Sequence, residues 1–445
     1  MKRPLALALV LAVAGGAAAA RQATPVDRTL NSQDYKNAVA VLERGHEQIV
    51  ADIIRLTEIP AAPFKEAARG KAYFDLLKQT SLTNLEIDPE GNVMGVRKGA
   101  PSTALGAGPS TTLGAGPSTA LGAGGLVAIA AHLDTVFPEG TDVHVKRTGT
   151  RLAAPGIGDN TRGLAVLLGI LRAMDAAKVR TRSDILFVAN VGEEGPGDLR
   201  GMRYLFQKGR YRNQIKSFIS IDGEGAGNEI TNGGVGSKRY KVAFKGPGGH
   251  SYGAFGLVSP AFAMGDAMTR IAQIKVPSSP KTTFNVGVVG GGTSVNSIPF
   301  ETWLELDLRS ESKTELDKLD QSAKALIAAA VNNENSVRSI AQGRVTADIK
   351  LIGDRPSGQT ASNLALPQTA AAVVRALGMS PTFNYSSTDA NLPMSLGIPA
   401  VTLDSGGSGG RAHALDEWID VEPSKSLVGI RSILAILLAT AGQSG

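Results

Sequence analysis

The segment from residue 125 to residue 131, which reads Gly-Leu-Val-Ala-Ile-Ala-Ala, constrains the fold more than any other part of the sequence. A near-continuous apolar run of this length, bounded by glycine, is typical of a strand buried on both faces of a sheet. Similar strands are predicted over 183–190 and 217–221, and helices are predicted over 162–178 and 201–208. This alternation predicts an α/β fold in which a mainly parallel mixed sheet is flanked by helices.

A different order of elements follows this region. Strands and helices are predicted in the order β-α-β-β-α-β, over 240–245, 258–274, 282–289, 302–308, 314–333 and 344–351. This is the order of the ferredoxin-like split βαβ unit, a self-contained α+β layer. We therefore expect a ferredoxin-like domain over 237–350, inserted into a discontinuous domain made of 21–236 and 351–445.

Residues 1–20 have the pattern of an export signal. Lys2 and Arg3 precede an apolar run over 5–13, and small residues over 15–20 follow as a cleavage region. The apolar run is shorter than the roughly 20 residues that a membrane span needs, so a membrane anchor is the weaker alternative. We expect a signal peptide over 1–20 and an exported mature protein, periplasmic or secreted, without stable membrane insertion.

Residues 101–124 consist of three copies of an eight-residue unit, Pro-Ser-Thr-(Ala/Thr)-Leu-Gly-Ala-Gly. Eight residues are too few for the unit of a solenoid, and this composition is typical of a flexible loop. The segment 99–125 is therefore expected to be a flexible connection between two strands.

The composition limits the chemistry that is available to the chain. Cysteine is absent, which excludes disulfides, thiolate metal sites and cysteine nucleophiles. The formal net charge is +6 without a block of basic residues, and aromatic residues make up 5%, so no nucleic-acid partner is expected. Because the chain has five histidines, a metal site must be built mostly from carboxylates.

Polar side chains follow the predicted strands at the edge where parallel sheets place their ligands. Two histidines and several carboxylates stand there: His132 and Asp134, Asp159, Glu193 and Glu194, Asp222, and His413. A single acidic residue after a strand is more often a solvated loop residue than a ligand. Taken together, however, the set is the mixture expected for two divalent zinc or cobalt ions that share a bridge.

The motifs around these residues resemble those of the di-zinc peptidases and deacylases of clan MH. Among them are His132-Leu133-Asp134, Gly158-Asp159-Asn160 and Gly192-Glu193-Glu194-Gly195, which occur in that order. The family includes peptidase T, glutamate carboxypeptidase, aminoacylase and succinyl-diaminopimelate desuccinylase, and the resemblance covers roughly residues 35–440. It implies two divalent metal ions as cofactors, Zn²⁺ in the first place and Co²⁺ as the alternative.

The resemblance also implies five metal ligands and two residues that assist them. The ligands would be His132 and Asp222 for one ion, Glu194 and His413 for the other, and Asp159 for both. Asp134 would orient His132, and Glu193 would be the general base that takes a proton from the bridging water.

The inserted domain is expected to act as a lid and as a dimerisation module, because a ferredoxin-like sheet exposes an edge that can pair with a second copy. His250 lies in the glycine-rich turn 246–252. By the resemblance, it would stabilise the tetrahedral oxyanion, often across a dimer interface, so a homodimer is expected.

Three further residues are candidates for substrate binding. Asn296 and Arg309 are candidates for holding a substrate carboxylate, although a turn residue and a salt-bridged sheet residue are equally good interpretations. Asp389, in the Ser-Thr-Asp-Ala-Asn motif, would support the metal pocket or contact substrate. His46 and His144 match no motif and are expected on the surface.

The function expected from these features is that of an exported di-zinc metallo-exopeptidase. It would hydrolyse the terminal peptide bond of short peptides by a metal-bound hydroxide, with a glutamate as general base. An N-acyl amino acid amidohydrolase, acting on N-acyl amino acids with the same metal site, is the alternative. A non-catalytic peptide-binding relative would be marked by the loss of a metal ligand, and the sequence lacks none of them.

Overall fold

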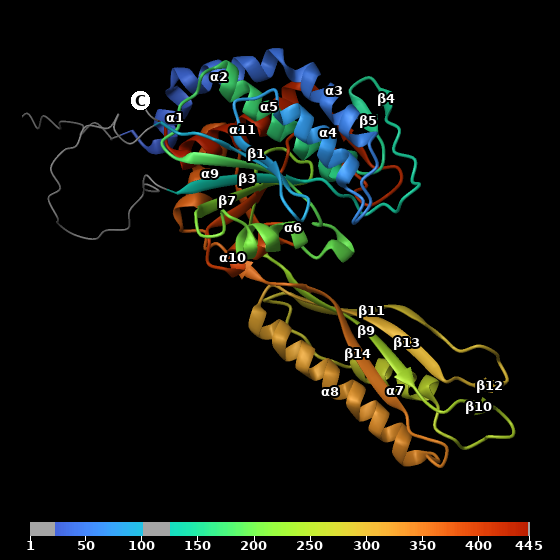
Figure 1. Cartoon of the computed structure of the whole chain (residues 1–445). Coiled ribbons are helices and arrows are strands. Elements are labelled where there is room, and N and C mark those ends of the chain that lie inside the picture. Colours follow the sequence, from blue (N-terminus) through green and yellow to red (C-terminus); the bar gives the residue numbers. More distant parts are fainter. Residues whose placement is uncertain (1–22, 101–124, 444–445) are drawn as a thin grey trace, which may run out of the picture.

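The computed structural model describes residues 23–100 and 125–443 (Figure 1). The predicted signal peptide and the eight-residue repeat lie outside the described residues. The chain forms a larger body that carries a mixed sheet, and a second body projects from it. The second body is inserted between strands β8 and β15 of the first.

The large sheet is parallel at its centre and antiparallel towards its edges. Its order is β1 (Thr83–Ile87), β2 (Val93–Arg97), β6 (Asp184–Asn190), β3 (Leu126–His132), β7 (Ile215–Ile221), β17 (Ala400–Leu403), β8 (Glu229–Gly234) and β15 (Gly358–Gln359), and β16 (Thr382–Ser386) also pairs with β8. Strands β6, β3, β7 and β17 are parallel to one another. The predicted fold class, a mainly parallel mixed sheet flanked by helices, is confirmed.

Helices cover both faces of this sheet (Figure 1). One face packs against α1 (Pro25–Asn31), α2 (Gln33–Arg44), α3 (His46–Thr57), α4 (Ala67–Leu77), α5 (Gly163–Ala176), α9 (Ala365–Ala376) and α11 (Pro423–Ala441), and the other against α6 (Arg200–Arg203) and α10 (Asn391–Ser395). In β3, Val127 and Ile129 belong to the first core and Ala128 to the second. The apolar run of β3 is therefore explained by burial on both faces.

Helix α11 has the length and hydropathy of a membrane span. In the structure, 72% of its apolar window is buried inside the protein. Ile433, Leu434 and Leu437 belong to the core between α11 and the sheet. This burial is typical of the core helix of a large domain.

The inserted body is an antiparallel sheet with two helices on one face (Figure 1). Its strands lie in the order β11 (Thr282–Gly291), β13 (Glu301–Ser310), β9 (Gly236–Lys245) and β14 (Thr346–Arg355), with helices α7 (Pro260–Ile271) and α8 (Lys313–Val337). The order is that of the ferredoxin-like unit. At the end farthest from the large sheet, the short strands β10 (Gly249–His250) and β12 (Ser297–Ile298) pair with each other (Figure 1).

The chain enters and leaves the inserted domain at neighbouring points. β9 begins directly after β8, and β14 ends shortly before β15. Gly234 of β8 and Gly358 of β15 are partners in the antiparallel ladder. A rotation of the inserted domain would therefore act on both connecting strands at the same place.

Candidate metal centre

His132 is the last residue of strand β3 and the first of the candidate ligands along the chain. Its ring is fully buried, and Nδ1 lies 3.0 Å from the main-chain oxygen of Asp134. Nε2 lies 3.0 Å from Oδ1 of Asp159 and 3.5 Å from Oδ1 of Asp222. Asp222 follows β7, the parallel neighbour of β3. The carboxyl ends of these strands therefore bring the imidazole of His132 and the carboxylate of Asp222 together, and the turn after β5 (Arg151–Ala153) adds Asp159.

His413 approaches Asp159 from the other side. It lies in the connection between β18 (Ser408–Gly410) and β19 (Trp418–Asp420). These two strands form a small sheet with β5 and β4 (Lys146–Thr148). Nε2 of His413 lies 3.1 Å from Oδ2 of Asp159 and 3.1 Å from Oε1 of Glu194. Each oxygen of Asp159 thus faces a different histidine, as a bridging ligand requires.

Asp134 lies next to His132 and to the main chain of Glu193 and Glu194. Its Oδ1 accepts a hydrogen bond from the main-chain N–H of Glu193 at 3.1 Å, and its Oδ2 accepts one from Glu194 at 2.8 Å. Oδ1 of Asp134 also lies 3.7 Å from Nδ1 of His132. The carboxylate of Asp134 therefore fixes the main chain of both glutamates, while the main-chain oxygen of the same residue holds Nδ1 of His132.

The charges of the site attract cations. Burial alone would lower the pKa of His132, but the surrounding carboxylates outweigh it and raise this pKa well above its usual value. Hydrogen bonds to Asp159 and Glu194 raise the pKa of His413 to about 10. Burial opposes the ionisation of Asp159, yet the two histidines hold its pKa well below its usual range. The carboxylates therefore favour positive charge between them, which divalent cations supply.

The donor atoms fit two metal ions with a shared ligand. One group consists of His132, Asp159 and Asp222, and another of Asp159, Glu194 and His413, each with its ligand atoms within 4.8 Å of one another. Nε2 of His132 is buried and has no hydrogen-bond partner within the described part of the chain, although the carboxylates of Asp159 and Asp222 face it. A nitrogen and oxygen donor set of this kind suits zinc and related divalent ions.

Glu193 has a different environment from that of its neighbour. Its Oε1 accepts a hydrogen bond from Nη1 of Arg355 at 2.8 Å, and its main-chain oxygen accepts one from Nη2 of the same residue. Burial raises the pKa of Glu193 well above its usual range, although Arg355 opposes the shift. Together with His132 and Glu194, Glu193 also forms a third group of possible ligands.

Glu417 holds the turn that carries Asp159. Its Oε1 accepts hydrogen bonds from the main-chain N–H groups of Gly158 at 2.7 Å and Asp159 at 2.9 Å, and its Oε2 accepts one from Gly156 at 2.9 Å. The side chain is 1% exposed. Gly156, at φ 77°, takes a left-handed conformation that glycine adopts without strain.

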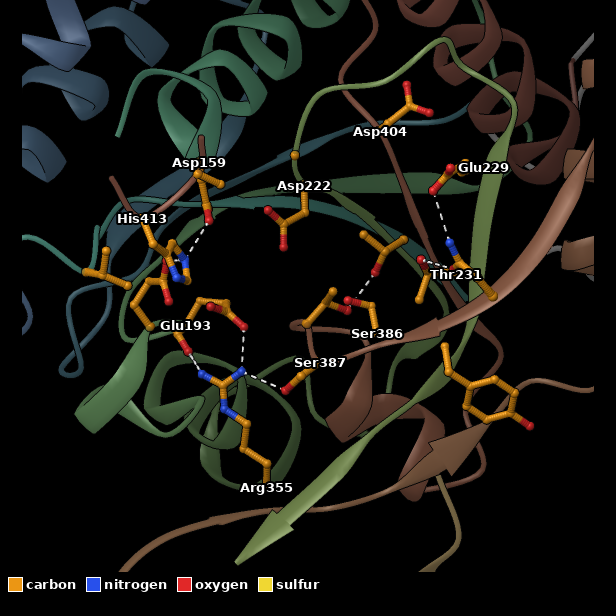
Figure 2. A pocket seen from close by; sticks show the side chains of 18 of the residues that line it. Asp159, Glu193, Asp222, Glu229, Thr231, Arg355, Ser386, Ser387, Asp404 and His413 are labelled. Atoms are coloured by element: carbon orange, nitrogen blue, oxygen red, sulfur yellow. Dashed lines mark hydrogen bonds and ion pairs between the residues drawn. The ribbon is translucent and has the colours of Figure 1, made fainter. Parts of the chain in front are cut away.

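A cavity of about 700 Å³ opens next to the candidate ligands (Figure 2). The candidate ligands Asp159, Glu194, Asp222 and His413 line it together with Glu193, the arginines Arg239, Arg309 and Arg355, and the more distant Glu229, Tyr385 and Asp404. The arginines come from strands of the inserted domain. The cavity thus combines an acidic wall on the larger body with basic groups on the inserted one.

The structure does not bring all the predicted site residues to this cavity. Arg309 lines it, but its Nε lies 2.7 Å from Oδ2 of Asp307. Asp389 is buried behind it, where its Oδ2 accepts a hydrogen bond from Asn190 at 2.7 Å. His250 and Asn296 are exposed, on or beside the short β10 and β12 ribbon at the far end of the inserted domain (Figure 1).

Sequence analysis missed three features of this region. Arg355 is not among the predicted site residues. Glu417 stands in the run Asp416-Glu417-Trp418, which resembles those of peptidases of the family, but this resemblance assigns it no role in the site. The prediction that His46 is on the surface was wrong, because its side chain is buried at the start of α3. His144 is exposed, as expected.

Solved structures share this fold at low sequence identity. The aminopeptidase PepT of Bacillus cereus is 19% identical with a TM-score of 0.68, over 89% of this chain and 99% of that one. The di-peptidase Dug1p of Saccharomyces cerevisiae is 14% identical with a TM-score of 0.68, over 92% and 98% of the two chains. The YXEP protein of Bacillus subtilis, described as a dinuclear metal-binding peptidase, is 17% identical with a TM-score of 0.59, over 88% and 98%.

A comparison with curated protein sequences gave no match. The sequence model of peptidase family M20/M25/M40, however, matches residues 128–439, which is more than half of the chain and includes all five candidate ligands. This match confirms the resemblance drawn from the motifs. The chain therefore belongs to peptidase family M20/M25/M40 and is a metal-dependent hydrolase that acts on peptide bonds.

Proposed function

We propose that the protein is an exopeptidase with two divalent metal ions, which removes a terminal residue from short peptides. The observation that carries the proposal is the position of Asp159, whose two oxygens face His132 and His413 separately. Asp222 completes the first ligand group and Glu194 the second. Zinc is the proposed native metal, and cobalt the expected substitute.

The ions would supply the positive charge that acidifies water and polarises the scissile carbonyl. Glu193 would take a proton from the attacking water on a carboxylate oxygen and deliver it to the nitrogen of the leaving amine. The contacts of the two glutamates support this division of roles, because Oε1 of Glu193 is bound by Arg355 whereas Oε1 of Glu194 faces His413. Asp134 would keep His132 and the main chain of both glutamates in position.

The dimensions and charges of the cavity support a short, polar substrate. About 700 Å³ accommodates a few residues. Arg239 and Arg309 of the inserted domain, which share the single carboxylate of Asp307, would hold a substrate carboxylate. The titles of related structures name an aminopeptidase and a di-peptidase.

A substrate panel tests this function. Purified protein would be freed of metal, reloaded with zinc or cobalt, and assayed with Ala-Ala, Ala-Ala-Ala, N-acetyl-Ala-Ala and N-acetyl-Ala. We expect release of free alanine from the unblocked peptides in the reloaded protein and none in the metal-free protein. Preferential hydrolysis of N-acetyl-Ala to acetate and alanine would instead identify a deacylase.

The role of Glu193 is tested by Glu193→Gln, which keeps the shape of the side chain but removes the base. We expect turnover to fall by roughly 10²–10⁴-fold while two metal ions stay bound, as measured by elemental analysis. Loss of metal from this variant would mean that Glu193 is a metal ligand and that Glu194 is the base.

We further propose that the protein is exported, with residues 1–20 removed as a signal peptide, and that the inserted domain serves as lid and dimerisation module. The lysine–arginine pair followed by an apolar run supports the first proposal. The exposed sheet edges at β11 and β14 support the second. Fractionation of expressing bacteria, with mass determination of the mature N-terminus, tests export; light scattering tests the dimer.

A further inference from the structure

Arg355 links the inserted domain to the proposed base. It is the last residue of β14, where the chain returns to the larger body, and it is 4% exposed. Nη1 donates to Oε1 of Glu193 at 2.8 Å and to Oγ of Ser387 at 3.0 Å, and Nη2 donates to the main-chain oxygen of Glu193. Figure 2 shows the guanidinium below Glu193, with Ser387 beside it.

The other two arginines of the cavity are engaged elsewhere. Nε of Arg239 lies 3.2 Å and Nε of Arg309 2.7 Å from the carboxylate of Asp307, which belongs to the inserted domain. Among the described residues, Arg355 is therefore the arginine that binds Glu193.

The geometry of the contact restricts the side chain of Glu193. A glutamate has three rotatable bonds, and its carboxylate must come within hydrogen-bond distance of the proton that it removes. A planar guanidinium that binds the carboxylate and the main chain of one residue fixes the distance between them, which the point charge of a lysine does not do. In the described part of the chain, no hydrogen bond engages Oε2 of Glu193, so this oxygen is free to act while Oε1 is held.

We propose that Arg355 is a positioning residue, which holds the carboxylate of Glu193 in the orientation that proton transfer requires. The proposal rests on the proposed role of Glu193 as base. Because Arg355 acts through Glu193, its loss lowers turnover and leaves substrate binding nearly unchanged. Its place at the end of β14 makes the orientation of the base depend on the strand that joins the two domains.

The test compares Arg355→Ala and Arg355→Lys with Arg203→Ala as the matched control. Arg203 also contacts the end of β14, through the main-chain oxygen of Asp354, but it does not touch Glu193. With the panel member of highest kcat/KM, we expect kcat of Arg355→Ala to fall about 10–100-fold and KM to change less than about threefold. Added guanidinium ion should restore part of kcat in Arg355→Ala, Arg355→Lys should remain slow, and Arg203→Ala should match the wild type.

A second comparison separates this inference from the proposed function. In the Glu193→Gln background, Arg355→Ala should lower kcat by less than about twofold, since its partner is already inactive. If Arg355→Ala lowers kcat in the Glu193→Gln background as much as it does in the wild type, the positioning role is wrong. It is also wrong if Arg355→Ala alone raises KM and leaves kcat unchanged. If Arg355→Ala loses metal or thermal stability, Arg355→Lys decides, and wild-type turnover in that variant contradicts the proposal. Wild-type activity in Glu193→Gln alone would refute the proposed base itself.

Discussion

Glu417 shows how one side chain can shape a metal site without belonging to it. Three main-chain N–H groups of the turn around Asp159 converge on its carboxylate. Burial raises the pKa of Glu417 to about 7, against the effect of these hydrogen bonds. Because Asp159 is the proposed bridge, the precision of both metal positions depends on this carboxylate.

We expect Glu417→Gln to weaken metal binding by about 10–100-fold. The NH₂ group of the glutamine would face one of the three main-chain N–H groups that now donate to a carboxylate oxygen. Metal affinity would be measured by competition with a chromophoric chelator. Asp416→Asn is the matched control, since Asp416 is the exposed neighbour that pairs with Arg411 at 3.0 Å. Equal affinities in the two variants would show that the turn keeps its shape without Glu417.

At the scale of elements, α11 supports the sheet that positions the ligands. Leu434 of this helix is fully buried. We expect Leu434→Ala to destabilise the larger body by about 2–5 kcal/mol, from lost transfer free energy and the cavity left behind. Leu364→Ala, at a side chain that is 46% exposed, should cost less than about 1 kcal/mol in the same urea titration. Similar urea midpoints of unfolding for the two variants would mean that the core around α11 relaxes into the space left by the shortened side chain.

The sequence predicts elements well where a local pattern determines them. The strand β3 is apolar at every position before His132, and the ferredoxin-like order of the inserted domain follows from short periodic segments. The strand ends also indicated that His132 and Asp222 would converge, and the structure brings them together with Asp159, which comes from the turn before α5. These predictions need only the period of the pattern and the rule that parallel strands share an edge.

Contacts between distant segments could not be predicted in the same way. Arg355 meets Glu193 across 162 residues of sequence, and only the path of β14 back to the larger body makes them neighbours. His46 looked like an exposed helix residue, but neighbouring elements cover it. His250 and Asn296 carried a recognisable motif, which does not specify the distance between the end of the inserted domain and the cavity.

At the scale of the whole molecule, the two bodies have separate hydrophobic cores. The core of the inserted domain includes Tyr240, Phe244, Leu304 and Ile327 and does not share residues with those of the larger body. We expect calorimetry to resolve two unfolding transitions. Metal binds the folded larger body, so a chelator should lower the midpoint of one transition only. A single transition that shifts as a whole would show that the domains unfold together.

The proposed dimer makes a prediction about mixed subunits. If His250 acts on the site of the partner, a hybrid of Glu193→Gln and His250→Ala subunits contains one intact site. Random exchange of subunits should then restore about a quarter of wild-type activity from two inactive proteins. Native mass spectrometry would establish that hybrids form. If hybrids form without activity, or if the protein is monomeric by light scattering, His250 does not act on the site of a partner subunit.

The distribution of the ligands along the chain has a consequence for biosynthesis. His132 is the first and His413 the last, and the whole inserted domain lies between them in sequence. A ribosome must therefore have passed the inserted domain and reached His413 before the second ligand group exists, and β19 must still pair with β5 to hold it. No early fragment contains both candidate ligand groups. If two ions bind as proposed, the ions available where the finished chain folds would decide the metal content of the enzyme.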